Sequence, residues 1–504
     1  MSAFDNLKLA MIPSGFKEDT LYGVLPEPSN SSELITNGTF DTDSDWTKGT
    51  GWSISGGKAY FDNSTGTEFY QSLPTSAGKY IISFDLEITN GTIQTSFNSP
   101  STSTIEAFTT SGTKSFEITT TSSFSRFRFV GLANSVFNID NVSVTQIIDG
   151  DFTFSRGTTA TRVNSQGLIE ASATDVPRLD YSDGTCPSLL LEPPRTNKIE
   201  DSEDFTDASV WNTNSGSVSL EGGYLAPDGT NTAYKVTQGS NKAAALLFSG
   251  AGGILAADAR SIFARTTSGT GQISLTSHNL NTNNQFTITE EWQRFEVNGT
   301  TSGAGATNFY AVDFRGSSTN LTEVILWGAQ SEVGDYVSSY IPTTGTAVTR
   351  SEDFCDNAGN STIFNSGEGV LYAEIAALHD DLTFRVIGLS DDTNSNIVKF
   401  GYRTHSNAIY FEVRDGNVSQ AFQIAYVSDI TQFHKVAIKF KENDFAMWID
   451  GSEAKTDSLG TMPSGLTMIN FDGGNRGANF LGKCKALLYF NRALTDAELA
   501  DLTT

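Results

Sequence analysis

Residues 80–97 read Tyr-Ile-Ile-Ser-Phe-Asp-Leu-Glu-Ile-Thr-Asn-Gly-Thr-Ile-Gln-Thr-Ser-Phe, and this stretch decides the fold class. Its apolar residues alternate with polar ones from Ile82 to Ile88. An alternation with a period of two places one face of a β-strand in a core and the other face in water. The pair Asn90-Gly91 follows, and it favours the positive φ angles of a type I′ turn. The stretch therefore predicts a β-hairpin.

The same strand pattern recurs along the chain, whereas helix signals are few. Between residues 434 and 450 apolar residues alternate with lysines, turn at residues 442–444 and alternate again, which predicts a second hairpin. The clearest helix signal is at the C-terminus, where Thr495 and Glu498 have the spacing of a capping box. These patterns predict an all-β chain that ends in a short helix.

Composition agrees with this fold class. The 504 residues are 38% hydrophobic, 11% aromatic and 18% charged, which is typical of β-sandwiches and not of disordered chains. The length corresponds to about three domains. Because the net charge is −26, we expect no binding to nucleic acid or to an anionic membrane surface. No run of 18 apolar residues occurs, so we also expect no membrane insertion.

An internal repeat indicates how the chain is divided. A phenylalanine precedes a tryptophan by six residues twice, at Phe40 and Trp46 and at Phe205 and Trp211. A Gly-Gly pair and a similar strand follow each copy. The repeat predicts two related β-sandwiches, at residues 31–148 and 200–335. The other predicted segments are an N-terminal anchor at 1–30, a connector or base at 149–199, a second connector at 336–365 and a third sandwich at 366–504.

Motifs at both ends of the first sandwich have a recognisable form. They are Asn37-Gly38-Thr39-Phe40-Asp41, Trp46, Trp52-Ser53-Ile54 and Ile139-Asp140-Asn141-Val142-Ser143-Val144. The segment resembles the carbohydrate-binding jelly-roll modules found beside bacterial xylanases and glucanases. In that family calcium lies where the first and last strands meet, and the resemblance implies Asp41 and Asp140 as ligands. The alternative is that Asp41 caps a turn and Asp140 is solvated. The second sandwich has Thr322 in place of Asp140, so we expect no calcium there.

The third segment carries different motifs. They are Met447-Trp448-Ile449-Asp450-Gly451, Gly473-Gly474-Asn475 and the run from Phe490 to Glu498. The segment resembles the concanavalin A-like sandwich of laminin-G and pentraxin type. The acidic pair that often follows a glycine in the penultimate strand is missing, because Lys483-Cys484-Lys485 follows Gly482. The predicted fold class is therefore all-β, with three β-sandwich domains (two jelly rolls and one concanavalin A-like domain) joined by irregular connector segments.

Short motifs in the anchor and the first connector form a distinctive set. They are Leu9–Glu18, Leu21–Pro26, Asp151–Asn164, Pro177–Tyr181, Ser188–Pro193 and Arg195–Asn197. The set resembles the attachment regions of bacteriophage virion proteins such as tail fibres and head fibres, with the first sandwich inserted between its two blocks. The resemblance implies other virion proteins as partners and, by analogy with phage fibres, a homo-oligomer that is a trimer.

The N-terminal residues also agree with a location in the virion. Residues 1–6 have neither the basic region nor the apolar region of a secretory signal. A virion protein is assembled in the host cytoplasm and reaches the outside by lysis. The sequence therefore predicts a virion structural protein (a fibre or a capsid decoration) that displays glycan-binding-type domains for adsorption to bacterial surface polysaccharide.

Aromatic side chains are the candidates for sugar binding, because rings act as stacking platforms. The candidates are Trp46, Trp52, Tyr60 and Trp211. The alternative is that a tryptophan in a sandwich belongs to its core, where large aromatic side chains dominate. If single sites are weak, several copies on one particle supply avidity.

Catalytic residues are not expected. The four histidines are scattered, and Cys186, Cys355 and Cys484 lack metal-binding spacing. The Glu-x-Asp-x-x-Glu motif of concanavalin A-like glucanases does not occur. We therefore predict a protein that is not an enzyme. Two alternatives remain, namely a purely architectural virion protein without glycan binding and a polysaccharide-degrading spike.

Overall fold

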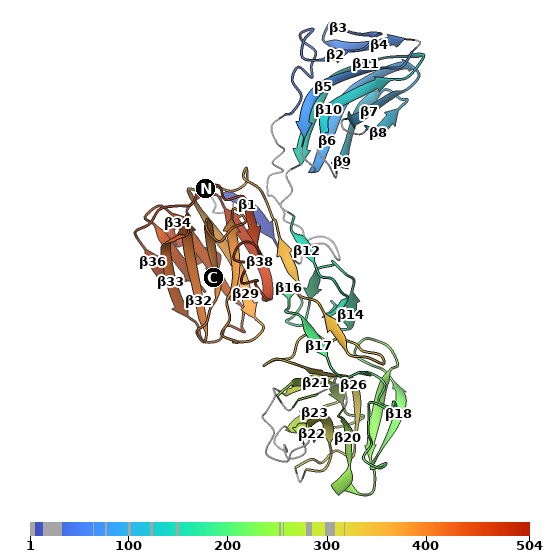
Figure 1. Ribbon diagram of the computed structural model, residues 1–504, viewed down its shortest axis with the longest axis vertical. Helices are drawn as coiled ribbons and strands as arrows, with labels where there is room; N and C mark the ends of the chain where they lie inside the picture. Colours follow the sequence, from blue (N-terminus) through green and yellow to red (C-terminus); the bar gives the residue numbers. More distant parts are fainter. Residues whose placement is uncertain are drawn as a thin grey trace. The chain divides into compact units, whose positions relative to one another are not determined.

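The all-β fold class is confirmed by the structure, a computed structural model of the chain (Figure 1). It describes residues 6–13, 33–63, 65–75, 78–98, 102–120, 124–147, 151–250, 254–255, 257–278, 285–297, 308–316 and 318–504. The described residues form β-strands, a 3-10 turn at Lys242–Ala244 and one α-helix, α1, at Asp496–Thr503. None of their helices is long and apolar enough to cross a membrane. The chain forms two compact units, one of Leu25–Gly150 and one of Met1–Val24 with Asp151–Thr504.

The first unit is a sandwich of two five-stranded antiparallel sheets. One sheet has the order β2 (Thr47–Lys48), β5 (Thr67–Thr75), β10 (Phe124–Gly131), β7 (Ile93–Asn98) and β8 (Thr102–Phe108). The other has the order β3 (Trp52–Ser55), β4 (Lys58–Asn63), β11 (Ser135–Ile147), β6 (Gly78–Asn90) and β9 (Gly112–Thr120). Aromatic and aliphatic side chains from both sheets form one core.

The hairpin predicted at residues 80–97 is wrong, although both of its strands exist. Strand β6 pairs with β9 and β11, whereas β7 pairs with β8 and β10 in the opposite sheet. Asn90-Gly91 therefore carries the chain from one sheet to the other. Only Gly91 has a positive φ, 89°, and a Cβ there would lie 2.2 Å from the Ser135 hydroxyl, so the crossover requires glycine.

A second sandwich follows in the other unit, and it repeats the strand order of the first. Its five-stranded sheet has the order β18 (Val218–Tyr224), β19 (Ala233–Gln238), β26 (Glu323–Glu332), β21 (Ala259–Arg265) and β24 (Gln293–Val297). Its four-stranded sheet has the order β20 (Leu246–Ser249), β25 (Asn308–Asp313), β22 (Gly271–His278) and β23 (Gln285–Ile288). With β18 matched to β3 and β26 to β11, each described strand of the second sandwich has a counterpart in the first, and only β2 of the first sandwich lacks one among the described strands of the second.

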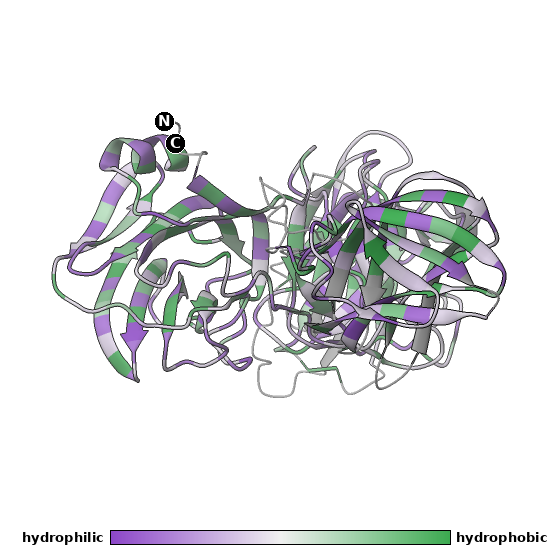
Figure 2. Ribbon diagram, turned by 90° about the horizontal axis from the view of Figure 1, so that it is seen from above, coloured by the Kyte–Doolittle hydropathy of each residue, from purple (hydrophilic) through white to green (hydrophobic). Residues whose placement is uncertain are grey.

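The C-terminal sandwich has an eight-stranded sheet and a five-stranded sheet. The larger has the order β15 (Arg178–Asp180), β16 (Ser188–Leu191), β38 (Gly482–Phe490), β29 (Glu368–Ala377), β34 (His434–Lys441), β35 (Phe445–Ile449) and β36 (Ser452–Asp457), with β1 (Leu7–Met11) also on β38. The smaller has the order β33 (Val418–Tyr426), β32 (Ala408–Asp415), β31 (Ile397–Tyr402), β30 (Arg385–Ser390) and β37 (Met468–Asn470). Along many strands hydrophobic and hydrophilic residues alternate, as the colour bands of Figure 2 show.

Two local predictions for this sandwich are confirmed. Strands β34 and β35 pair as the hairpin predicted at residues 434–450. At the helix, the Thr495 hydroxyl accepts a hydrogen bond from the Glu498 amide, and the Glu498 side chain accepts one from the Thr495 amide, which completes the capping box.

The anchor and the connectors are built into the second unit. Strands β1 and β16 share one edge of β38. The two connectors also pair with each other, through β12 (Thr153–Ser155) with β28 (Phe354–Asp356) and β17 (Arg195–Asn197) with β27 (Val348–Arg350). A further hairpin joins β13 (Ala160–Val163) to β14 (Ile169–Ser172). The phage-like motif at residues 21–26, and residues 14–18 of the motif before it, lie outside the described residues.

Candidate functional site

A groove of about 610 Å³ lies on the five-stranded sheet of the C-terminal sandwich. The groove residues are Phe384, Val386, Asn394, Lys399, Arg403, Tyr410, Glu412, Arg414, Phe422, Gly473, Gly474, Gly477 and Ala478. They come from β30 to β33, from the ends of these strands and from the glycine-rich loop after β37. No local sequence pattern indicates this set, because its members are spread over about 95 residues.

Strand β32 shows why polar side chains reach this face. Tyr410, Glu412 and Arg414 line the groove, whereas Phe411 and Val413 between them are fully buried in the sandwich. The period of two along the strand places these two sets on opposite faces of the sheet. The same alternation that fills the core therefore supplies the floor of the groove.

Arg403 lies among three aromatic rings of the groove. Its guanidinium carbon is 4.8 Å from the ring centroid of Phe422, 5.5 Å from that of Phe384 and 5.6 Å from that of Tyr410. The rings of Phe384 and Phe422 are each within about 6 Å of Tyr410. Phe384 is 40% exposed and Phe422 is 38% exposed, so both present ring surface to a ligand. Cation–π contacts at these distances hold the guanidinium against the aromatic cluster.

Ion pairs occupy the floor of the groove. The Lys399 amino group lies 3.1 Å from a Glu412 carboxylate oxygen and donates a hydrogen bond of 2.7 Å to the Asn394 side-chain oxygen. The guanidinium of Arg414 lies 3.8 Å from the other Glu412 oxygen. Burial lowers the pKa of Lys399, and the Glu412 carboxylate opposes that shift. These groups can hydrogen-bond ligand hydroxyls beside an aromatic stacking surface.

Hydrolysis of a glycosidic bond requires a pair of carboxyl groups about 5–10 Å apart. Among the groove residues, Glu412 is the one carboxylate, and it is engaged by two cations. The arrangement therefore suits binding better than acid–base catalysis.

The tryptophans proposed as sugar platforms lie in the cores. Trp46, Trp52 and Trp211 are at most 6% exposed. In the first sandwich Trp46 and Trp52 both stack on Phe69, with ring centroids 4.6 and 4.7 Å apart. Each indole N–H donates to a backbone carbonyl, for example that of Trp211 to Asp201 at 2.8 Å. Burial contradicts their assignment as stacking platforms and agrees with the alternative that they are core residues.

Tyr60 is the remaining aromatic candidate. It lies on β4 and is 37% exposed. No second exposed large aromatic side chain is found among the described residues of the first sandwich. A stacking platform in the first sandwich would therefore consist of Tyr60 alone, whereas the groove has two exposed rings, those of Phe384 and Phe422.

The carboxylates proposed as calcium ligands serve local turns. Asp41 accepts a hydrogen bond of 2.8 Å from the Thr39 hydroxyl, and Asp140 accepts one of 2.7 Å from the Asn141 amide. Calcium requires six to eight oxygen ligands. Over the described ranges, no three His, Cys, Asp or Glu side chains gather in a way that could hold a metal ion. Asp41 and Asp140 belong to no such cluster in the described part of the chain, and calcium in the first sandwich stays a prediction.

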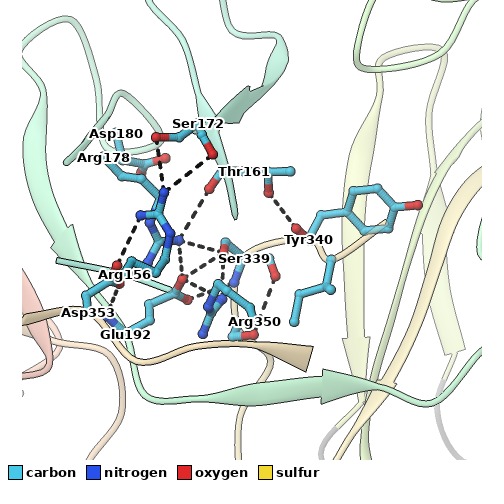
Figure 3. A network of polar contacts seen from close by, with 12 residues as sticks. Arg156, Thr161, Ser172, Arg178, Asp180, Glu192, Ser339, Tyr340, Arg350 and Asp353 are labelled. Carbon is cyan, nitrogen blue, oxygen red and sulfur yellow. Dashed lines mark hydrogen bonds and ion pairs between the residues drawn. The ribbon is translucent and has the colours of Figure 1, made fainter. Parts of the chain in front are cut away.

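The connectors contain a buried network of charges, drawn in Figure 3. Asp353 pairs with Arg178 and, at 3.1 Å, with Arg156, while Glu192 pairs with Arg178 and, at 2.7 Å, with Arg350. All five side chains are at most 3% exposed. Burial alone would raise the pKa of Glu192, but the guanidinium groups of Arg350 and Arg178 hold it well below its ordinary value.

This network contains one charged residue from each of three phage-like motifs. Arg156 comes from Asp151–Asn164, Arg178 from Pro177–Tyr181 and Glu192 from Ser188–Pro193. The motifs meet because their strands are joined through the second connector. The charges of Arg156, Arg178 and Glu192 therefore stabilise the base of the unit.

Comparisons with known proteins identify no family. No family model matches the chain, and no curated protein matches it. Among solved structures, similarity is found to a carbohydrate-binding module of a Ruminococcus gnavus sialidase bound to α2,6-sialyllactose, with 12% identity, 30% of this chain and 94% of that chain covered, and a TM-score of 0.25. A domain of a Geobacillus stearothermophilus arabinanase in complex with arabinotriose gives 11% identity, 30% and 73% coverage and a TM-score of 0.24.

A Trypanosoma rangeli sialidase in complex with sialic acid gives 10% identity, 100% and 89% coverage and a TM-score of 0.22. Similarities of this size carry no inference about ligand or activity.

Proposed function

We propose that the chain is a bacteriophage virion structural protein, a fibre or a decoration protein, whose C-terminal sandwich binds bacterial surface polysaccharide without cleaving it. The observation that carries the binding function is the groove in which the exposed rings of Phe384 and Phe422 flank Arg403 above the ion pairs of Glu412.

The chemistry of the groove suits a sugar. Ligand sites combine aromatic walls with a few placed polar groups, and a pyranose ring offers an apolar face and a rim of hydroxyl groups. The two phenylalanines provide the apolar surface, while Asn394, Lys399 and Glu412 provide hydrogen-bond acceptors and donors.

The connector supports the virion part of the proposal. Its phage-like motifs build a buried ionic base that is separate from the groove. A shared base that carries variable binding domains is the organisation expected of attachment proteins. In a homo-oligomer, which we propose to be a trimer, several grooves would bind one polymer and raise the effective affinity.

Binding of the full-length protein to host envelope polysaccharides tests the proposal. Phe422→Ala should weaken binding by about two- to tenfold, since an aromatic contact is worth about 0.5–1.5 kcal/mol. Tyr60→Ala is the matched control, because it removes an equally exposed ring from the other unit. Binding that is lost with Tyr60 and kept without Phe422 would place the site in the first sandwich instead.

Two other outcomes would contradict the proposal. Absence of binding to every host polysaccharide would favour a purely architectural protein. New reducing ends after incubation with host polysaccharide would show an enzyme.

A further inference from the structure

We infer that the groove selects an acidic saccharide and that Arg403 binds the anionic group of this sugar. This inference rests on the proposed function, because it assigns the class of ligand to the same groove.

Charge is the first observation. Three cations, Lys399, Arg403 and Arg414, line the groove, and Glu412 is its one carboxylate among the groove residues. The whole chain carries a net charge of −26, so a positive groove is opposite in sign to the rest of the molecule. At physiological ionic strength charges are screened beyond about 8 Å, so the distant negative charges of the chain act only weakly on a ligand in the groove.

The second observation is that Arg403 is the cation left without an anion. Glu412 pairs with Lys399 and lies near Arg414. Arg385, which precedes Val386 on β30, pairs with Asp381 at 2.9 Å. For Arg403, by contrast, the described part of the chain offers neither an ion pair nor a hydrogen bond, and its Nε is buried without a partner.

The aromatic rings around Arg403 favour the binding of an anion to its guanidinium. They cover part of the guanidinium of Arg403 with apolar surface, so that its Nε is buried without a hydrogen-bond partner while the side chain as a whole is half-buried. A partly buried donor that lacks a partner is costly, and an anion that satisfies it recovers this cost. The planar guanidinium matches a carboxylate through two parallel hydrogen bonds, and such pairs are stronger than neutral ones.

The rings of Phe384 and Phe422 limit which acidic ligands fit the groove. An isolated small anion would contact Arg403 but would leave the faces of Phe384 and Phe422 in water. A sugar that carries a carboxylate, or another anionic group, places its ring against a phenylalanine while its charge reaches the guanidinium. The predicted ligand is therefore an acidic residue of a polysaccharide.

Three polymers test this inference with the full-length protein. The first is a polyuronate, the second is the same polymer after reduction of its carboxyl groups to alcohols, and the third is a polymer with phosphodiester-linked sugars. The polyuronate should bind about tenfold or more tightly than its reduced form, as expected for a charge-assisted bidentate contact. Preference for the phosphate polymer over the reduced polymer would support the inference with phosphate as the anionic group.

Variants assign the preference to one side chain. Arg403→Met should remove the difference between acidic and reduced polymers, while Arg403→Lys should keep part of it, because lysine retains the charge but lacks the planar fork. Arg385→Gln is the control, since it removes a paired cation on the same sheet and should leave the preference unchanged. The comparison of polymers on the unmodified protein decides the question even if Arg403→Met does not fold.

The outcomes separate the two proposals. Equal binding of acidic and reduced polymers would overturn the inference and leave polysaccharide binding intact. A preference for acid that survives in Arg403→Met would overturn the role of Arg403. Absence of binding to host polysaccharides and to all three polymers would overturn both the proposed function and the inference.

Discussion

Substitution of Glu192 by glutamine should destabilise the second unit strongly. The Glu192 carboxylate accepts hydrogen bonds from the Ser339 amide at 2.8 Å and the Ser339 hydroxyl at 2.6 Å, and it pairs with Arg178 and Arg350. In the Glu192→Gln variant one oxygen becomes an amide nitrogen, which donates and cannot accept. The variant keeps the shape of the side chain but leaves the three buried arginines of the network, Arg156, Arg178 and Arg350, with one carboxylate, that of Asp353.

The expected loss follows from this burial. Removal of one partner from a buried ion pair costs about 3–5 kcal/mol, because the remaining charge is uncompensated. With an m-value of about 2 kcal/mol per molar urea, the unfolding midpoint of this unit should fall by about 2 M. The loss of unfolding free energy on removal of an exposed ion pair serves as the reference. Glu368 and Lys441 are 3.1 Å apart and 33% and 51% exposed, so Glu368→Gln should cost less than about 1 kcal/mol.

The pH dependence has a definite sign. Because the folded state lowers the pKa of Glu192, its ion pairs stabilise the protein fully above the unfolded pKa of about 4.5. That contribution is lost as the pH falls below about 4.5 towards the folded value. The difference in unfolding free energy between the wild type and Glu192→Gln should therefore be constant at neutral pH and should narrow below pH 4.5 or so.

Urea unfolding followed by circular dichroism and tryptophan fluorescence, from pH 7 down to pH 3, measures both effects. A loss for Glu192→Gln no larger than that for Glu368→Gln would refute the reasoning. A difference that does not change on acidification would show that another group is responsible.

Two further predictions concern the first unit. Trp46→Ala should lower the unfolding free energy of this sandwich by about 3–5 kcal/mol, since the ring stacks on Phe69 in the core, whereas Tyr60→Ala should change it by at most about 0.5 kcal/mol. Calorimetry of the full chain checks this pair, and equal effects would contradict the assignment of Trp46 to the core. If calcium binds where the first and last strands meet, a chelator should lower the melting temperature of this unit, and Asp140→Ala should abolish the effect. A melting temperature that is the same with and without chelator would end the calcium prediction.

Local patterns were sufficient for much of the fold. The hairpin at residues 434–450 and the capping box at Thr495 were predicted correctly, because turn chemistry and strand alternation act between residues that are neighbours in sequence. The Phe-Trp repeat coincides with two sandwiches of one strand order, and in each the two rings contact each other in the core.

The stretch 80–97 shows the limit of such patterns. Its alternation is real, since Ile82, Phe84 and Leu86 are buried. Yet Asn90-Gly91 joins two sheets, because the strands on either side find their partners elsewhere in the chain. A turn sequence restricts the backbone angles, but it does not say whether the two strands will pair with each other or face each other across a core.

The candidate site was missed for a related reason. Phe384, Arg403 and Phe422 are far apart in sequence, and only the pairing of β30 to β33 brings them together. Tryptophans were favoured instead because sequence shows the size of a ring and not which face of the sheet it occupies.

The sequence by itself determined that this chain is an all-β protein with a repeated sandwich, because alternation, turn residues and caps are short-range properties. Only the tertiary structure decided that the charges of the phage-like motifs form a buried base and that Arg403 is left unpaired between aromatic rings. The physical reason is that burial and ion pairing depend on contacts between strands that are distant in the chain.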